Sequence, residues 1–126
     1  MTNTKGKQLI EACSEGRIEI VQKLIETGED VNIFNEFGWS PLLIACGTGE
    51  LAIVQFLLNK GADINATNKY GYTPLHIACS AGRIEITQLL LDNGADINMM
   101  TKNDQTPLFF ACLNGHTEII KLLERA

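Results

Sequence analysis

Basic residues are few in this 126-residue sequence, and they are never clustered. There are 10 lysines and arginines against 15 aspartates and glutamates, which gives a formal net charge of −5. Nucleic-acid phosphates and anionic lipid surfaces are bound by clustered Lys and Arg side chains. The composition therefore argues against a nucleic-acid partner and against a membrane-surface partner.

Long apolar runs are also absent, although 45% of the residues are hydrophobic, which is enough for a buried core. No run approaches the ~18–20 apolar residues that a membrane-spanning helix requires. Residues 1–6 contain no apolar stretch after a basic residue, so we expect no secretory leader. We expect one domain, residues 1–126, that does not enter a membrane.

Motifs that carry catalysis are missing as well. The sequence holds no G-x-x-x-x-G-K-[ST], no H-E-x-x-H and no G-x-S-x-G. The only two histidines are His76 and His116. We expect structural roles for both, and we expect no enzyme activity, no metal and no cofactor.

What the sequence does contain is a repeat with a period of 33 residues. The recurring residues are prolines, glycines, cysteines and asparagines: Pro41, Pro74 and Pro107; Gly16, Gly49, Gly82 and Gly115; Cys13, Cys46, Cys79 and Cys112; Asn32, Asn65 and Asn98. A fixed period of this size indicates stacked copies of one supersecondary unit. Such a stack offers an extended binding surface rather than an enclosed pocket.

The copy at residues 68–100 shows the unit most clearly. Thr73-Pro74 predicts a helix start, because Thr caps free backbone N–H groups and Pro loses no hydrogen bond at that position. Apolar residues follow at helical spacing until Gly82, which predicts the helix end. A second helix is expected over residues 84–91. A turn at residues 70–72 precedes the first helix.

The segment Gly71-Tyr72-Thr73-Pro74-Leu75-His76-Ile77-Ala78 resembles the ankyrin-repeat motif G-x-T-P-L-H-x-A. Residues 61–65 and 94–98 are similar to that family's G-A-D-x-N ending. The resemblance covers about residues 5–126. It implies an all-α solenoid of four stacked helix-turn-helix units with short β-hairpin fingers. The repeats are expected at approximately residues 5–34, 35–67, 68–100 and 101–126.

The outer repeats depart from the motif in ways that predict polar caps. Lys7-Gln8 replace a Ser-Pro pair, Lys23 replaces an apolar residue, and Glu124 stands where other repeats carry Leu. Because terminal repeats need a polar outer side for solubility, we expect both ends of the stack to be closed. Nothing in the sequence demands a dimer, so we expect a monomer. Asp104 replaces the glycine of the third finger and is expected to accept a left-handed backbone.

The four cysteines are not expected to form disulfides. Equivalent positions in stacked helices lie roughly 8–10 Å apart, whereas a disulfide needs Cα atoms within about 7 Å. The sequence contains no C-x-x-C pair, so we expect no structural zinc site. We interpret Cys46, Cys79 and Cys112 as buried and unreactive, and Cys13 as the most accessible thiol. Unpaired thiols favour an intracellular, cytoplasmic location.

The resemblance implies that a protein partner contacts the fingertips and the concave face of the first helices. The candidate partner-binding residues are Phe37 and Trp39; Lys69, Tyr70 and Tyr72; Lys102, Asn103 and Gln105; Ser80 and Ala81; Leu113 and Asn114. Aromatic residues gather in and beside the first two fingers, and aromatic anchors dominate many interfaces. The alternative is that these rings pack finger against finger. Lys69 and Lys102 favour a partner segment that is acidic or phosphorylated. The alternative is that both lysines are simply charged, solvated surface residues.

Two functions remain open from the sequence. One is a non-catalytic module that binds a protein through its fingers and its concave helix face. The alternative is a structural spacer or scaffold segment of a larger ankyrin protein, without a partner of its own. The aromatic fingertips favour the first, because a spacer does not need them. The resemblance also places Asn32, Asn65 and Asn98 where ankyrin-directed asparaginyl hydroxylation occurs.

Overall fold

The computed structural model describes residues 4–126, and these residues form eight α-helices and no β-strand. The helices are α1 (Thr4–Glu15), α2 (Ile18–Glu26), α3 (Pro41–Thr48), α4 (Leu51–Asn59), α5 (Pro74–Ala81), α6 (Ile84–Asp92), α7 (Pro107–Leu113) and α8 (Thr117–Arg125). Residues 1–3, on which the expected absence of a leader partly rests, lie outside the described residues. None of the helices in the described part of the chain is long and apolar enough to cross a membrane.

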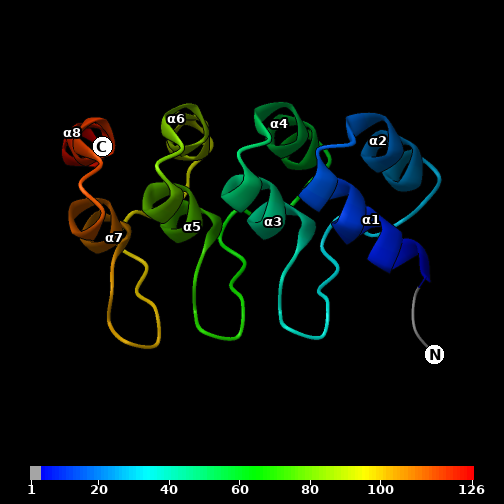
Figure 1. Ribbon diagram of the computed structural model, residues 1–126, viewed down its shortest axis with the longest axis horizontal. Helices are drawn as coiled ribbons and strands as arrows, with labels where there is room; N and C mark the ends of the chain where they lie inside the picture. The colour runs from blue at the N-terminus through cyan, green and yellow to red at the C-terminus, as the bar shows by residue number, and fades with distance from the viewer. Residues whose placement is uncertain (1–3) are drawn as a thin grey trace.

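The helices form a two-layered stack of four pairs (Figure 1). The odd-numbered helices pack side by side in one layer, α1 on α3, α3 on α5 and α5 on α7. The even-numbered helices pack in the same order in a second layer, which lies above the first in Figure 1. Three long loops project from the odd-numbered layer as fingers (Figure 1). The predicted all-α solenoid of four helix pairs is thereby confirmed.

Local sequence signals fix the start and end of the first helices. The Ser40 hydroxyl accepts a hydrogen bond from the Leu43 amide at 3.3 Å, and the Thr73 hydroxyl accepts one from the His76 amide at 3.2 Å. A proline occupies the first helical position after each of these caps. At the other end, Gly82 adopts φ +75°, a left-handed conformation that favours glycine. The caps and glycines therefore set the helix lengths, as predicted.

The repeats are joined by an apolar core and by side-chain hydrogen bonds. Leu9, Leu42 and Leu75 occupy the same position in successive repeats, and all three are buried. Full burial of one such side chain contributes about 1.5–3 kcal/mol. Across the loops, Asn32 Oδ1 accepts a hydrogen bond from the Asp63 amide at 2.8 Å. Each repeat therefore relies on its neighbour both for burial and for polar contacts.

The fingers are hydrogen-bonded turns rather than β-hairpins. In the first finger the Asn35 amide donates to the Trp39 carbonyl at 2.9 Å, while Asn35 Oδ1 accepts from the Trp39 amide at 3.0 Å. A span of five residues is too short for a ladder of paired strands. The third finger closes in the same way, with Asp104 at φ +60°. The left-handed backbone predicted for Asp104 is confirmed.

The outer surface of α7 contradicts the expected polar cap at the carboxyl end of the stack. Leu108, Phe109, Cys112 and Leu113 are exposed on α7, and we call these four residues the C-terminal face. Glu124 is exposed on α8 but does not cover them. At the other end, every exposed residue of α1 is polar, as expected. A single glutamate on the second helix cannot close a face that the first helix makes apolar.

The cysteine interpretation was correct for the pairing and wrong for the accessibility. All four cysteines are free; Cys13, Cys46 and Cys79 are buried, and Cys112 is exposed. Burial raises the pKa of the Cys13 thiol to about 12. The reason for the error is the direction of stacking. The cysteine of each first helix faces the following repeat. Cys13 is therefore covered by the second repeat, whereas no described repeat covers Cys112. Cys112, rather than Cys13, is the accessible thiol.

Candidate functional site

The first two fingers present two exposed aromatic rings on either side of a lysine. Phe37 and Tyr70 are 55% and 57% exposed. The Lys69 ammonium group lies 5.9 Å from the centre of the Phe37 ring and 5.3 Å from the centre of the Tyr70 ring. Both distances fall in the range of cation–π attraction. We call these three residues the fingertip cluster; it presents apolar area and a positive charge together.

The other two aromatic residues of these fingers lie deeper. Trp39 is partly buried. Tyr72 is also partly buried, with its ring 5.2 Å from the Phe110 ring and 6.0 Å from the His76 ring. The Tyr72 ring thus packs against residues of α5 and α7 rather than finger against finger, and it contributes to the contact between the second finger and α7. Sequence spacing alone does not distinguish the exposed rings from the packed ones.

In the third finger, Lys102 and Asn103 are exposed, whereas Gln105 is partly buried. The Gln105 side-chain oxygen accepts a hydrogen bond from the Thr101 hydroxyl at 3.2 Å. The Gln105 carbonyl lies 2.9 Å from His76 Nε2. Gln105 thus holds the finger in place, whereas the candidates Lys102 and Asn103 are exposed.

His76 has the structural role that the sequence predicted. Its Nδ1 accepts a hydrogen bond from the Thr73 amide at 3.0 Å, so the proton sits on Nε2, which donates to the Gln105 carbonyl. The ring is fully buried, and this burial lowers the pKa of His76, opposed by the hydrogen bonds to backbone carbonyls. His76 therefore links α5 to the third finger.

The ends of the first helices provide a second set of candidate residues. Asn114 Nδ2 donates to the Ser80 carbonyl at 2.9 Å and to the Ser80 hydroxyl at 3.2 Å. His116 Nε2 lies 3.1 Å from the same carbonyl. Ala81 and Leu113 are exposed beside them. Ser80 and Asn114 are thus hydrogen-bonded to each other, and Leu113 is an exposed apolar side chain next to them.

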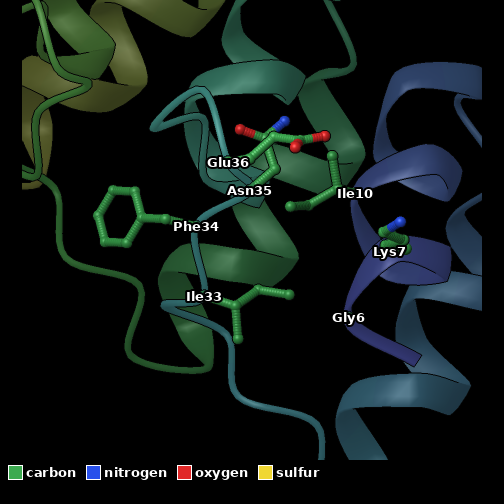
Figure 2. A pocket seen from close by; sticks show the side chains of 7 residues that line it. All are labelled: Gly6, Lys7, Ile10, Ile33, Phe34, Asn35 and Glu36. Atoms are coloured by element: carbon green, nitrogen blue, oxygen red, sulfur yellow. The ribbon is translucent and has the colours of Figure 1, made fainter. Parts of the chain in front are cut away.

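A groove of about 460 Å³ lies between α1 and the first finger (Figure 2). Its lining residues are Gly6, Lys7, Ile10, Ile33, Phe34, Asn35 and Glu36. Figure 2 shows Lys7 and Ile10 on α1, facing the segment that carries Ile33, Phe34 and Glu36. No finger precedes α1 among the described residues, so the space beside the first finger stays open on this side. The groove combines an apolar floor with one positive and one negative side chain.

Sequence reasoning missed the α1 side of this groove. From the sequence we interpret Lys7 only as part of a cap and give Ile10 no role, because the motif assigns recognition to the fingers and to the ends of the first helices. One signal could have revealed this side of the groove: Ile10 stands where Leu43 and His76 are fully buried, yet no finger precedes its repeat among the described residues.

Groups of three or more metal-binding side chains do not occur in the part of the chain that the structure describes.

These features define a helical-repeat protein built from four stacked pairs of helices. A family model described as ankyrin repeats (3 copies) matches residues 9–101, and a second, ankyrin repeats (many copies), matches residues 79–124. The chain belongs to the ankyrin repeat family. Ankyrin repeats are generally protein–protein interaction modules and are typically non-catalytic. No curated protein matches the sequence significantly.

Proposed function

We propose that this protein is a non-catalytic module that binds a protein segment along its fingers and its concave helix face. The observation that carries the proposal is the fingertip cluster, in which Phe37 and Tyr70 are each more than half exposed beside Lys69. Exposed aromatic rings next to a cation are typical hot-spot residues, each contributing about 2 kcal/mol or more to binding.

The groove beside α1 extends this surface towards the amino end of the stack. Phe34 is 50% exposed and lines the groove with Ile10, so an apolar side chain of the partner would enter there. Lys7 and Lys69 then favour an acidic segment on the partner. The partner is a protein rather than nucleic acid, because the chain carries a net charge of −5.

The free thiols support a proposal about the cellular compartment. Four free cysteines, three of them buried, fit a reducing environment, and we place the protein in the cytoplasm on this ground.

The proposal is tested by affinity capture from the source cell with three forms of the protein. These are the unchanged chain, a Phe37→Ala, Tyr70→Ala variant, and Ile84→Ala as a matched control. Ile84 is an exposed apolar residue on α6, away from the fingers. Circular dichroism verifies that each variant is folded. A protein retained by the unchanged chain and by Ile84→Ala, but lost by the double variant, is the expected result.

Two results would contradict the proposal. Equal retention by the double variant would remove the fingers from the binding surface. If none of the three forms captures a protein, the alternative of a structural spacer is favoured instead.

A further inference from the structure

One position in each repeat reaches back to the repeat before it, and it holds a different residue each time. The position directly precedes the second helix of repeats two to four, and its occupants are Glu50, Arg83 and His116. Each side chain lies close to the glycine that ends the preceding first helix, respectively Gly16, Gly49 and Gly82. The last carbonyl groups of an α-helix have no partner within the helix. A side chain at this position can therefore supply one.

Two of the three contacts between successive helix pairs are closed by such a donor. We call these contacts junctions and number them from the amino end. At the second junction, Arg83 Nη2 donates a hydrogen bond to the Gly47 carbonyl at 3.0 Å. At the third, Asn114 Nδ2 donates to the Ser80 carbonyl at 2.9 Å, and His116 Nε2 lies 3.1 Å from the same oxygen. Side-chain donors thus connect the end of a first helix to the next repeat at both junctions.

Glu50 cannot make this connection at the first junction. The equivalent carbonyl belongs to Ser14, and a carboxylate accepts hydrogen bonds but does not donate them. Glu50 makes no capping hydrogen bond to α4 either, because its carboxylate lies over Gly16. There it meets the negative end of the α1 dipole, which disfavours an anion. Arg17, the cation next to Gly16, is paired with Glu15 at 3.2 Å.

The other polar contacts do not compensate for this difference. The Asp63 amide donates to Asn32 across the first junction, but the same bond recurs across the second junction one repeat later. The third junction adds the link between His76 and the Gln105 carbonyl. The first junction therefore lacks a helix-end connection that the second and third junctions have.

We propose that the first junction is the release point of the stack, where α1 and α2 separate from α3 and α4 while the other repeats stay folded. Each repeat contacts only its neighbours, so the weakest junction opens before the rest of the stack unfolds. The opening uncovers Cys13, which the second repeat buries. It also separates the two sides of the groove, since α1 carries Lys7 and Ile10 on one of them. The proposal does not depend on the proposed function.

The three buried cysteines test the proposal, because each is covered by the repeat that follows it. Cys13, Cys46 and Cys79 therefore report on the first, second and third junctions. The measurement is labelling of the native protein with a thiol reagent and mass mapping, each rate being divided by that of the same cysteine in the urea-unfolded chain. Cys13 should be labelled about tenfold faster than Cys79, the effect expected of one hydrogen bond. It should still react far more slowly than the exposed Cys112.

Exchanging the two residues should move the release point. Glu50→Arg, which copies Arg83, should slow the labelling of Cys13 about tenfold and leave Cys79 unchanged. Arg83→Glu, which copies Glu50, should accelerate the labelling of Cys46 about tenfold. Glu85→Arg is the matched control, because it makes the same charge change at an exposed site on α6 and should alter none of these rates.

Two results would overturn the proposal. One is a Cys13 that is labelled no faster than Cys79 in the unchanged chain, a comparison that needs no substitution. The other is a Cys13 rate that Glu50→Arg does not lower, in a variant that circular dichroism shows to be folded.

Discussion

The two ends of the stack are built from the same repeat but present opposite chemistry to the surroundings. At the amino end, the exposed positions of α1 carry polar side chains, and its apolar residues Leu9, Ala12 and Cys13 are buried. At the carboxyl end, α7 keeps Leu108 and Cys112, whose interior equivalents are buried, and adds Phe109 and Leu113; nothing among the described residues covers these four. The comparison teaches that a repeat motif fixes which residue types stand at a position. The neighbouring repeat decides whether that position is buried.

The largest expected effect is a loss of stability on truncating an interior leucine, compared with the loss on truncating its counterpart on the C-terminal face. Leu75→Ala opens a cavity in the core and should lower the free energy of unfolding by about 2–5 kcal/mol. Leu108→Ala removes a partly exposed side chain and should cost about 1 kcal/mol. Urea denaturation of dilute, monomeric protein measures both. Equal losses would show that the carboxyl end is as well covered as the interior.

A smaller effect is expected from the glycines that end the first helices. Gly82 and Gly115 have φ values of +75° and +70°, so alanine at either site should cost roughly 1–2 kcal/mol. At Gly82 an added Cβ would also lie 2.8 Å from the His116 ring, whereas at Gly115 it would meet no atom within 4 Å. Gly82→Ala should therefore be worse by a further ~1–3 kcal/mol. Thermal unfolding compares the two, and identical losses would argue against the close approach of His116.

The smallest expected effect is a pH dependence that comes from the third repeat. Because the pKa of His76 is lowered in the folded protein, the unfolded chain binds a proton that the folded chain does not. Stability should be complete above about pH 6.5, the ordinary pKa of histidine. It should fall below that pH by at most about 1.4 kcal/mol per pH unit.

The matched control is His76→Leu, which copies Leu43 of the preceding repeat. This variant should lose that part of the pH dependence. It should also be less stable at neutral pH, because the Gln105 carbonyl loses its partner. Urea denaturation at several pH values measures both effects. An unchanged pH slope in His76→Leu would show that another group is responsible.

Much of the fold could be predicted from the sequence, because each signal acts locally. Thr73-Pro74 starts a helix and Gly82 ends one whatever lies beyond them. The 33-residue period then required the repeats to stack. The left-handed backbone of Asp104 could be predicted for the same reason, since it depends on the residue and its own turn.

The candidate site was predicted less completely, because exposure depends on packing between repeats. Tyr70 and Tyr72 are two positions apart in one finger, yet only Tyr72 meets the ring of Phe110 from the next repeat. The groove beside Ile10 depends in the same way on the space next to α1. Cys13 and Cys112 were assigned the wrong accessibilities because the side from which each is covered was not considered.

The most direct test of the difference between the two ends is the rate at which each thiol reacts in the native protein. The test uses the unchanged chain at low concentration, a thiol-specific reagent and mass mapping of the labelled cysteine. We predict that Cys112 reacts rapidly, while Cys13, Cys46 and Cys79 react only as the protein unfolds, because they are buried. Rapid labelling of Cys13, or a Cys112 as protected as Cys79, would contradict the account.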